Sequence, residues 1–217
     1  MPARWIGFLD FNGTLVRDFE NGYQATVNCI ETFAPKAKIP TRRECRLGKT
    51  HLVEFYHSRG VPQSVTKEMV YSQWYSSYHS SCEKKFANLT EGVRRVLAFL
   101  ESKKIPRIIV SGFAGDLTGY LEYNKLTNAF EEVYSRIADK AEKMQEILAR
   151  EKVNPQNAFY VGDTPEDVLA AKRAGVRAIG LISGFTDETL IRQASPDFYA
   201  ENFYDVWDFI RLEMRIR

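Results

Sequence analysis

The stretch Trp5-Ile6-Gly7-Phe8-Leu9-Asp10-Phe11-Asn12-Gly13-Thr14-Leu15-Val16 decides the fold of this chain. Its apolar run ends on the carboxylate of Asp10, and a Gly-Thr turn follows almost at once. A strand that ends in this way presents its last side chain at the carboxyl edge of an α/β sheet, where such sheets bind ligands. The stretch therefore predicts both a sheet and a site at the edge of that sheet.

Apolar runs that predict strands alternate with amphipathic runs that predict helices over most of the chain. The expected strands are Trp5–Asp10, Arg107–Ser111, Glu132–Ser135, Phe159–Asp163, Arg177–Ile182 and Phe198–Ala200, and the expected helices are Glu91–Lys103, Asp116–Asn124, Lys140–Lys152, Pro165–Ala174 and Tyr204–Met214. This alternation is typical of a doubly wound parallel sheet with helices on both faces. We expect Thr90 to cap the first of these helices and Gly175 to end the fourth.

The stretch from residue 17 to residue 86 breaks the alternation. It carries helical patterns and no convincing strand, at Tyr23–Phe33, Thr41–Gly48, Lys49–Arg59 and Ser64–Ser80. We therefore expect a small all-helical domain, residues 17–86, inserted after the first strand of an α/β core formed by residues 1–16 and 87–217. The expected hinges are Val16–Asp18 and Lys84–Asn88.

Polar residues also follow two later strands. Ser111 ends an apolar run and is followed by Gly112, and a hydroxyl beside a free backbone amide suits an anion. Asp163 ends another apolar run and can share a cation with Asp10 at the same edge of the sheet. Asp167 follows four residues later, and it also matches a capping box that begins at Thr164, so a capping role for it stays open.

These segments resemble, in order, the four motifs of the haloacid dehalogenase superfamily. The first is Asp10–Val16, the second is Ile108–Gly112, the third is Lys140, and the fourth is Gly162-Asp163…Asp167. The resemblance covers nearly the whole chain, and it implies a helical cap of the phosphoglycolate phosphatase type between the first and second strands.

The resemblance implies a Mg²⁺-dependent phosphatase that acts on a small phosphorylated metabolite. Asp10 would attack phosphorus and form an aspartyl-phosphate, which splits one displacement into two easier ones. Lys140 would neutralise Asp10 and bind the phosphate together with Ser111 and Gly112, and Lys143 is the alternative cation one helical turn on. The metal ligands would be Asp10, the backbone carbonyl of Asn12, Asp163 and Asp167, because Mg²⁺ prefers hard oxygen ligands.

Asn12 departs from the pattern, because most phosphatases of the superfamily carry there an Asp that protonates the leaving alkoxide and activates water. An Asn side chain does neither, and loss of such catalysis typically costs roughly 10²–10⁴ in rate. Three explanations stay open. Asn12 is an engineered near-isostere, or it is native with slow or assisted turnover, or the chain does other chemistry, as superfamily dehalogenases and phosphonatases do. A module that binds phosphate ligands without turnover is a further alternative. The acidic pair of Asp163 and Asp167 argues for a metal and therefore against a metal-free dehalogenase.

Within the expected cap, Arg46-Leu47-Gly48-Lys49-Thr50 is a basic break between helical patterns. Related caps carry their substrate loop at this place, so Arg46, Gly48 and Lys49 are candidate specificity residues. A plain turn between helices with solvated charges is the competing interpretation.

Composition narrows the class of protein. The chain has 217 residues, 44% hydrophobic and 27% charged, which is ordinary for a globular protein. Its net charge of +2 provides no large field to recruit nucleic acid. Three cysteines without Cys-x-x-Cys spacing argue against a disulfide framework or a zinc site. With no room for a signal peptide before Asp10 and no apolar run long enough to cross a bilayer, we expect a cytoplasmic protein without a membrane partner.

Overall fold

A computed structural model describes residues 4–48, 52–84, 87–115 and 117–213, with the backbone alone for residues 81–84. The chain forms two compact units, Met1–Arg17 with Asn88–Arg217 and, separately, Asp18–Ala87. We call them the core unit and the insert unit and describe each by itself.

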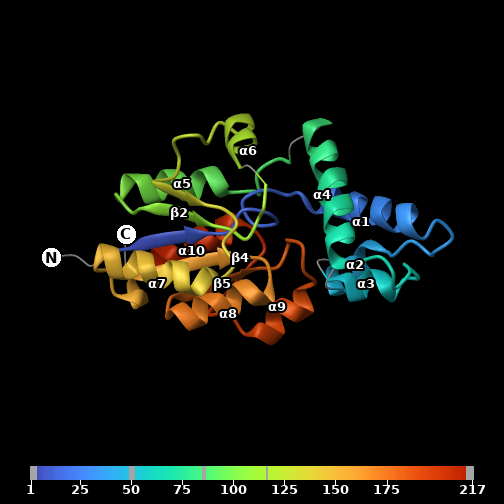
Figure 1. Cartoon of the computed structure of the whole chain (residues 1–217). Coiled ribbons are helices and arrows are strands. Elements are labelled where there is room, and N and C mark those ends of the chain that lie inside the picture. The colour runs from blue at the N-terminus through green and yellow to red at the C-terminus, as the bar shows by residue number, and fades with distance from the viewer. Residues whose placement is uncertain (1–3, 49–51, 85–86, 116, 214–217) are drawn as a thin grey trace. The chain divides into compact units, whose positions relative to one another are not determined.

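The core unit is built on a six-stranded sheet whose paired strands are all parallel (Figure 1). Its spatial order is β3-β2-β1-β4-β5-β6, with bounds β1 Ile6–Leu9, β2 Arg107–Val110, β3 Glu132–Tyr134, β4 Ala158–Gly162, β5 Arg177–Leu181 and β6 Phe198–Ala200. All residues of β1, β2 and β4 are buried, which explains why they form unbroken apolar runs rather than alternating ones. The predicted doubly wound parallel α/β sheet is confirmed.

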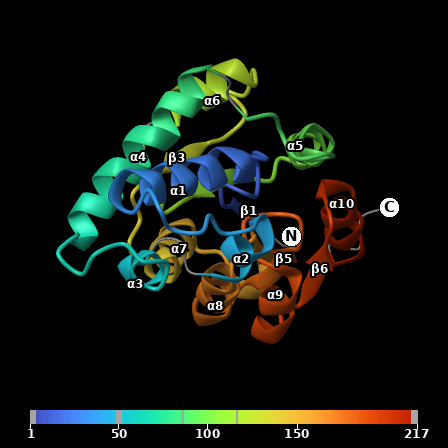
Figure 2. The same cartoon turned by 90° about the vertical axis from the view of Figure 1, so that its right-hand side faces the viewer.

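Helices cover both faces of this sheet. Their bounds are α5 Val93–Ser102, α6 Thr118–Tyr123, α7 Lys140–Glu151, α8 Pro165–Ala174, α9 Glu188–Ala194 and α10 Phe203–Glu213, with a short 3₁₀ turn at Pro155–Asn157. The pair α5 and α10 lies on one face and the pair α7 and α8 on the other (Figures 1 and 2). Helix α9 was not predicted from the sequence, because its seven residues are too few for a clear helical period. Asp187 caps its start by accepting from the Thr189 amide at 3.0 Å.

The end of α8 agrees with expectation, and the start of α5 does not. Gly175 ends α8 with a φ of 76°, in the left-handed region that glycine enters without strain. Thr90, however, is not the cap of α5, because that helix begins only at Val93 after Gly92. The Thr90 hydroxyl instead donates to the carbonyl of Thr14 at 2.6 Å and so holds the turn after β1.

The insert unit contains α1 Phe19–Phe33, α2 Arg42–Leu47, α3 Val53–His57 and α4 Lys67–Lys84 among its described residues, and α1 packs along α4. Helix α1 begins four residues before the predicted Tyr23, since Phe19 is buried and extends the apolar face of the helix. Thr41 and Glu44 form a capping box that starts α2. The beginning of the predicted Lys49–Arg59 helix lies outside the described residues.

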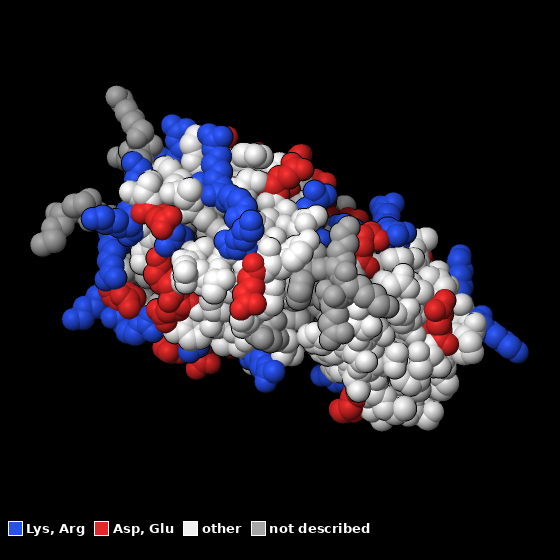
Figure 3. Space-filling view, turned by 90° about the horizontal axis from the view of Figure 1, so that it is seen from above, with Lys and Arg blue, Asp and Glu red and all other residues white. Residues whose placement is uncertain are grey.

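Charges of both signs are mixed over the surface seen in Figure 3, which agrees with the small net charge of +2. In the described ranges, no helix combines the length and the apolar character that crossing a bilayer requires.

Candidate active site

Three buried carboxylates meet at the carboxyl edge of the core sheet. Asp10 directly follows β1 and Asp163 directly follows the neighbouring β4, while Asp167 lies in the first turn of α8. Each offers an oxygen, and these oxygens lie within 4.8 Å of one another. The three residues are only 6%, 1% and 1% exposed, so water screens their mutual repulsion poorly.

Lys140 brings a positive charge into this cluster. Its Nζ lies 3.1 Å from Asp10 Oδ2 and 2.6 Å from Asp167 Oδ1. Lys140 is the first residue of α7, because the Asp139 side chain caps that helix by accepting from the amides of residues 141 and 142. The alternative cation, Lys143, pairs instead with Glu146 and lies 4.9 Å from the ring of Tyr134.

Burial and mutual repulsion shift the acidities of this cluster. Burial raises the pKa of Asp10 to about 6, against the lowering effect of the Lys140 ammonium. Burial and the charges of Asp167 and Asp10 raise the pKa of Asp163 well above its usual value. Burial opposes ionisation of Asp167 as well, but the Lys140 ammonium and its hydrogen bond outweigh burial and lower the pKa of that carboxyl. One ammonium thus stabilises the ionised form of only one carboxyl group, so ionisation of all three would leave two with excess negative charge.

Hydrogen bonds hold both oxygens of Asp167. Oδ1 accepts from Lys140 and, at 3.0 Å, from the Tyr160 hydroxyl. Oδ2 accepts from the amide and the hydroxyl of Thr164 at 3.1 and 2.6 Å, which is the predicted capping box. A Cβ at Gly162 would lie 2.4 Å from the Asp167 Cβ, so this position requires glycine.

Asp163 is held by the turn after β1 and by a distant loop. Its Oδ1 accepts from the Thr14 hydroxyl at 2.9 Å, and its Oδ2 accepts from the Phe185 amide at 2.6 Å. A Cβ at Gly13 or at Gly184 would come within 2.2 Å of Asp163. Gly13 has a φ of 69°, so its left-handed conformation and this close approach both favour glycine. Thr14 stands in the opening stretch, but no local signal in the sequence points to Phe185 or Gly184.

The cluster fits a divalent cation. Asp10 Oδ1 is buried without a hydrogen-bond partner among the described residues, although a buried carboxylate oxygen normally has one. A hard cation that prefers oxygen ligands would satisfy this atom and offset the excess negative charge. Asn12 follows Asp10 by two residues and is half-buried, and its backbone forms an isolated β-bridge with Val16. Its side-chain amide does not titrate in the physiological range.

Ser111 and Gly112 lie beside this cluster, at the end of β2, which pairs with β1 on the side away from β4. Ser111 is 2% exposed, and its Oγ accepts from the Phe113 amide at 3.3 Å. Gly112 is exposed, and a Cβ there would lie 3.8 Å from the Lys140 Cε. The fold thus places Gly112, one of the two expected anion-binding residues, next to the Lys140 side chain.

The candidate specificity residues belong to the insert unit, where contacts give two of them a structural role. The Arg46 guanidinium lies 4.0 Å from the centre of the Phe19 ring. Gly48 ends α2, and a Cβ there would meet the Phe55 ring at 2.5 Å. Lys49 lies outside the described residues.

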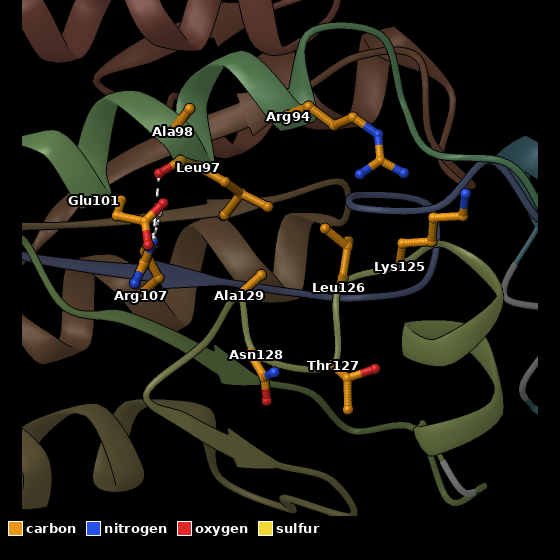
Figure 4. A pocket seen from close by; sticks show the side chains of 10 residues that line it. All are labelled: Arg94, Leu97, Ala98, Glu101, Arg107, Lys125, Leu126, Thr127, Asn128 and Ala129. Carbon is orange, nitrogen blue, oxygen red and sulfur yellow. Dashed lines mark hydrogen bonds and ion pairs between the residues drawn. The ribbon is translucent and has the colours of Figure 1, made fainter.

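A separate groove of about 450 Å³ lies in the core unit between α5 and the loop after α6 (Figure 4). It is lined by Arg94, Leu97, Ala98, Glu101, Arg107, Lys125, Leu126, Thr127, Asn128 and Ala129 and holds none of the candidate site residues. Arg107 is paired with Glu131 at 2.7 Å and with Glu101 at 3.8 Å, which accounts for its burial at the first position of β2.

Comparison with known proteins agrees with the geometry of this site. Residues 8–181 match the family model of haloacid dehalogenase-like hydrolases, which spans more than half of the chain. The chain therefore belongs to this family, and the resemblance stated from its motifs is confirmed.

Among curated proteins, the chain is similar to a phosphoglycolate phosphatase of Synechococcus elongatus, with 30% identity over 130 residues, which are 58% of this chain and 61% of that protein. It is also similar to a phosphoglycolate phosphatase of Vibrio vulnificus, with 31% identity over 64 residues, 30% of this chain and 28% of that one. The matched segments therefore span less than two thirds of either relative.

Solved structures share the fold over nearly the whole chain. A haloacid dehalogenase-like protein of unknown function from Agrobacterium tumefaciens superposes with a TM-score of 0.78 at 20% identity, covering 97% of this chain and 99% of that one. A β-phosphoglucomutase from Clostridium difficile superposes with a TM-score of 0.73 at 13% identity, covering 98% and 97%. At these identities the likeness concerns the fold alone.

Proposed function

We propose that this chain is a Mg²⁺-dependent phosphatase that hydrolyses a small phosphate monoester through an aspartyl-phosphate on Asp10. The observation that carries the proposal is the buried cluster in which Lys140 lies 3.1 Å from an oxygen of Asp10 and two further carboxylates lie beside it. The relatives named phosphoglycolate phosphatases support the same class of reaction.

Asp10, Asp163 and the backbone carbonyl of Asn12 would hold the Mg²⁺, with Asp167 as a further predicted ligand. The bound ion would supply positive charge where an anionic nucleophile meets an anionic phosphate. The direct role of Asp167 stays a prediction, because each of its oxygens already accepts two hydrogen bonds, whereas each oxygen of Asp163 accepts one within the described part of the chain.

The chain's own residues would perform two displacements. Asp10 attacks the phosphorus, the bond from phosphorus to the leaving oxygen breaks, and Lys140, Ser111 and Gly112 bind the phosphate oxygens. Water then attacks the aspartyl-phosphate, releasing phosphate and restoring the Asp10 carboxylate. Asn12 provides no titratable group for either proton transfer. The reaction should therefore be fastest with substrates whose leaving group departs readily as an anion.

We further propose that the insert unit acts as the cap and that Arg46, Gly48 and Lys49 contact the substrate. A cap excludes water and brings specificity residues to a small ligand. Phosphoglycolate and sugar phosphates are the substrate classes that we favour, with turnover slowed by Asn12 because their alkoxide leaving groups need a proton. A cytoplasmic location remains a prediction from the sequence.

The direct test measures phosphate release from p-nitrophenyl phosphate and from phosphoglycolate, with Mg²⁺ and with EDTA. We expect activity only with Mg²⁺, and we expect Asp10→Asn to abolish it while the far-ultraviolet circular dichroism stays unchanged. Full activity in EDTA, or in folded Asp10→Asn protein, would contradict the proposal.

Three rival functions would give different results. Halide release from a haloacid would mark a dehalogenase, and phosphate release from a phosphonate would mark a phosphonatase. Binding of phosphate esters without release would mark a binding module.

A further inference from the structure

Tyr160 contacts two residues of the candidate active site, Asp167 and Lys140, and the carbonyl of Val110, which directly precedes Ser111. It occupies the middle of β4, is 1% exposed, and belongs to the apolar cluster formed by the sheet with α7 and α8. Its hydroxyl lies 3.0 Å from the Val110 carbonyl and 3.0 Å from Asp167 Oδ1. Its ring centre lies 5.7 Å from the Lys140 Nζ, within the range of a cation–π contact.

These contacts connect elements that the chain places far apart in sequence. Val110 is the last residue of β2 and directly precedes Ser111, while Asp167 begins α8 and Lys140 begins α7. Because β1 lies between β2 and β4, the Tyr160 side chain reaches past the strand that carries Asp10. The Tyr160 side chain thus links the first turns of α7 and α8 to the end of β2.

The chemistry of the groups shows that the Tyr160 hydroxyl donates these hydrogen bonds. Carbonyl and carboxylate oxygens only accept, so the phenol is the donor to both and shares its proton between them. Burial raises the pKa of Tyr160 well above its usual value, so the hydroxyl stays protonated at neutral pH. Asp167 Oδ1 receives the Lys140 ammonium at the same time, at 2.6 Å. A fixed Asp167 oxygen therefore fixes the point at which the ammonium meets Asp10.

We propose that Tyr160 is a positioning residue of this site, whose hydroxyl fixes Asp167 so that Asp167 holds the Lys140 ammonium against Asp10. This inference rests on the proposed phosphatase function where it concerns the reaction, and on geometry alone where it concerns Lys140. In this arrangement Tyr160 touches no reacting atom and acts through Asp167.

The test is Tyr160→Phe in the full chain, which removes the hydroxyl and keeps the ring. With p-nitrophenyl phosphate and saturating Mg²⁺, we expect kcat to fall about tenfold, as for a lost hydrogen bond to a charged group, with KM changed less than twofold. The matched control is Tyr56→Phe, since Tyr56 is equally buried in the insert unit. It should leave both constants unchanged.

A double-mutant cycle separates positioning from general packing. If Tyr160 acts through Asp167, Tyr160→Phe should lower kcat less than about twofold in an Asp167→Asn background, because the charged acceptor is already gone. A tenfold loss in both backgrounds would overturn the inference.

A second measurement does not depend on catalysis. In EDTA, Lys140 is modified with an amine-reactive anhydride, and its labelling is compared by mass spectrometry with that of Lys143, which lies on the same helix. We expect the ratio of Lys140 to Lys143 labelling to rise at least about fivefold in Tyr160→Phe, and an unchanged ratio would overturn the inference. If the unaltered chain releases no phosphate but the ratio rises, the proposed function fails and the positioning of Lys140 by Tyr160 stands.

Discussion

At the scale of single residues, we predict that Asn12 limits how fast the proposed reaction turns over. It follows the expected nucleophile by two positions and stands where a general acid and base would be needed. The amide keeps nearly the volume of a carboxylate and removes its proton chemistry. The effect of Asn12 should therefore depend on the leaving group of the substrate.

The first prediction compares the chain as given with Asn12→Asp. A p-nitrophenolate departs without protonation, whereas a glycolate or sugar alkoxide needs a proton, so the substitution should accelerate alkyl phosphates most, by roughly 10²–10⁴. In the Asn12 protein, p-nitrophenyl phosphate should give a burst of phenolate followed by slow turnover, because aspartyl-phosphate accumulates. Stopped-flow measurements on both substrates test this. Equal rates on alkyl phosphates would show that another residue supplies the proton.

At the scale of elements, the site depends on how α8 begins against β4. Gly162 ends the strand, and the Asp167 side chain packs directly over it, so that a Cβ would lie 2.4 Å away. The opposite end of α8 favours a glycine for another reason, since Gly175 has a φ of 76°. The same helix thus offers one glycine at the site and one away from it.

The second prediction compares substitutions at these two glycines, Gly162 and Gly175. Gly162→Ala should displace Asp167 and with it Lys140, so activity should fall at least about tenfold. Gly175→Ala should only destabilise the fold, by about 1 kcal/mol for the left-handed conformation, with kcat unchanged. Thermal unfolding and steady-state kinetics on both variants provide the measurement. Equal losses of activity in the two variants would contradict the distinction.

At the scale of the whole molecule, the acidic cluster should make the stability of the fold depend on pH and on bound Mg²⁺. The pKa of Asp10 rises from 3.8 to about 6 on folding, and that of Asp163 shifts in the same direction. The folded protein therefore binds more protons than the unfolded chain between about pH 4 and pH 6, and metal-free stability should fall as the pH rises through this window. Asp167 shifts the other way, so its contribution is present above its ordinary pKa of 3.8 and is lost only at lower pH.

The third prediction is that in EDTA the unfolding temperature falls between pH 4.5 and pH 7. The change should correspond to about 1–3 kcal/mol, or about 2–4 °C for each kcal/mol. Saturating Mg²⁺ should remove this fall, because the ion binds the deprotonated carboxylates. Scanning calorimetry at several pH values, with and without Mg²⁺, tests it.

Asp163→Asn is the matched variant for this prediction. Its amide can donate to the Thr14 hydroxyl while its oxygen accepts from the Phe185 amide, so the hydrogen bonds of Asp163 can be kept. This variant should be more stable than the unaltered chain in EDTA at pH 7, should show a flatter pH profile, and should lose the stabilisation by Mg²⁺. A stabilisation by Mg²⁺ equal to that of the unaltered chain would show that the metal is bound elsewhere.

The sequence by itself determined the sheet, the order of its motifs and the family. Strands buried on both faces, such as β1 and β4, leave unbroken apolar runs, and each is followed directly by a polar residue that local pattern alone reveals. Asp10, Ser111, Asp163 and the capping box at Thr164 could be found in this way. The start of α7 was predicted too, because Lys140 opens a clear helical period.

Only the tertiary structure decided which side chains meet. The choice between Lys140 and Lys143 depends on how α7 lies against the sheet, and Thr90 holds the turn after β1 instead of capping α5. Tyr160 looks like any other core residue of β4 until its hydroxyl is found 3.0 Å from Asp167. The local sequence pattern indicates the secondary structure of one segment, whereas these contacts join segments that are far apart in the chain. They are strong because they are buried where β4, α7 and α8 meet.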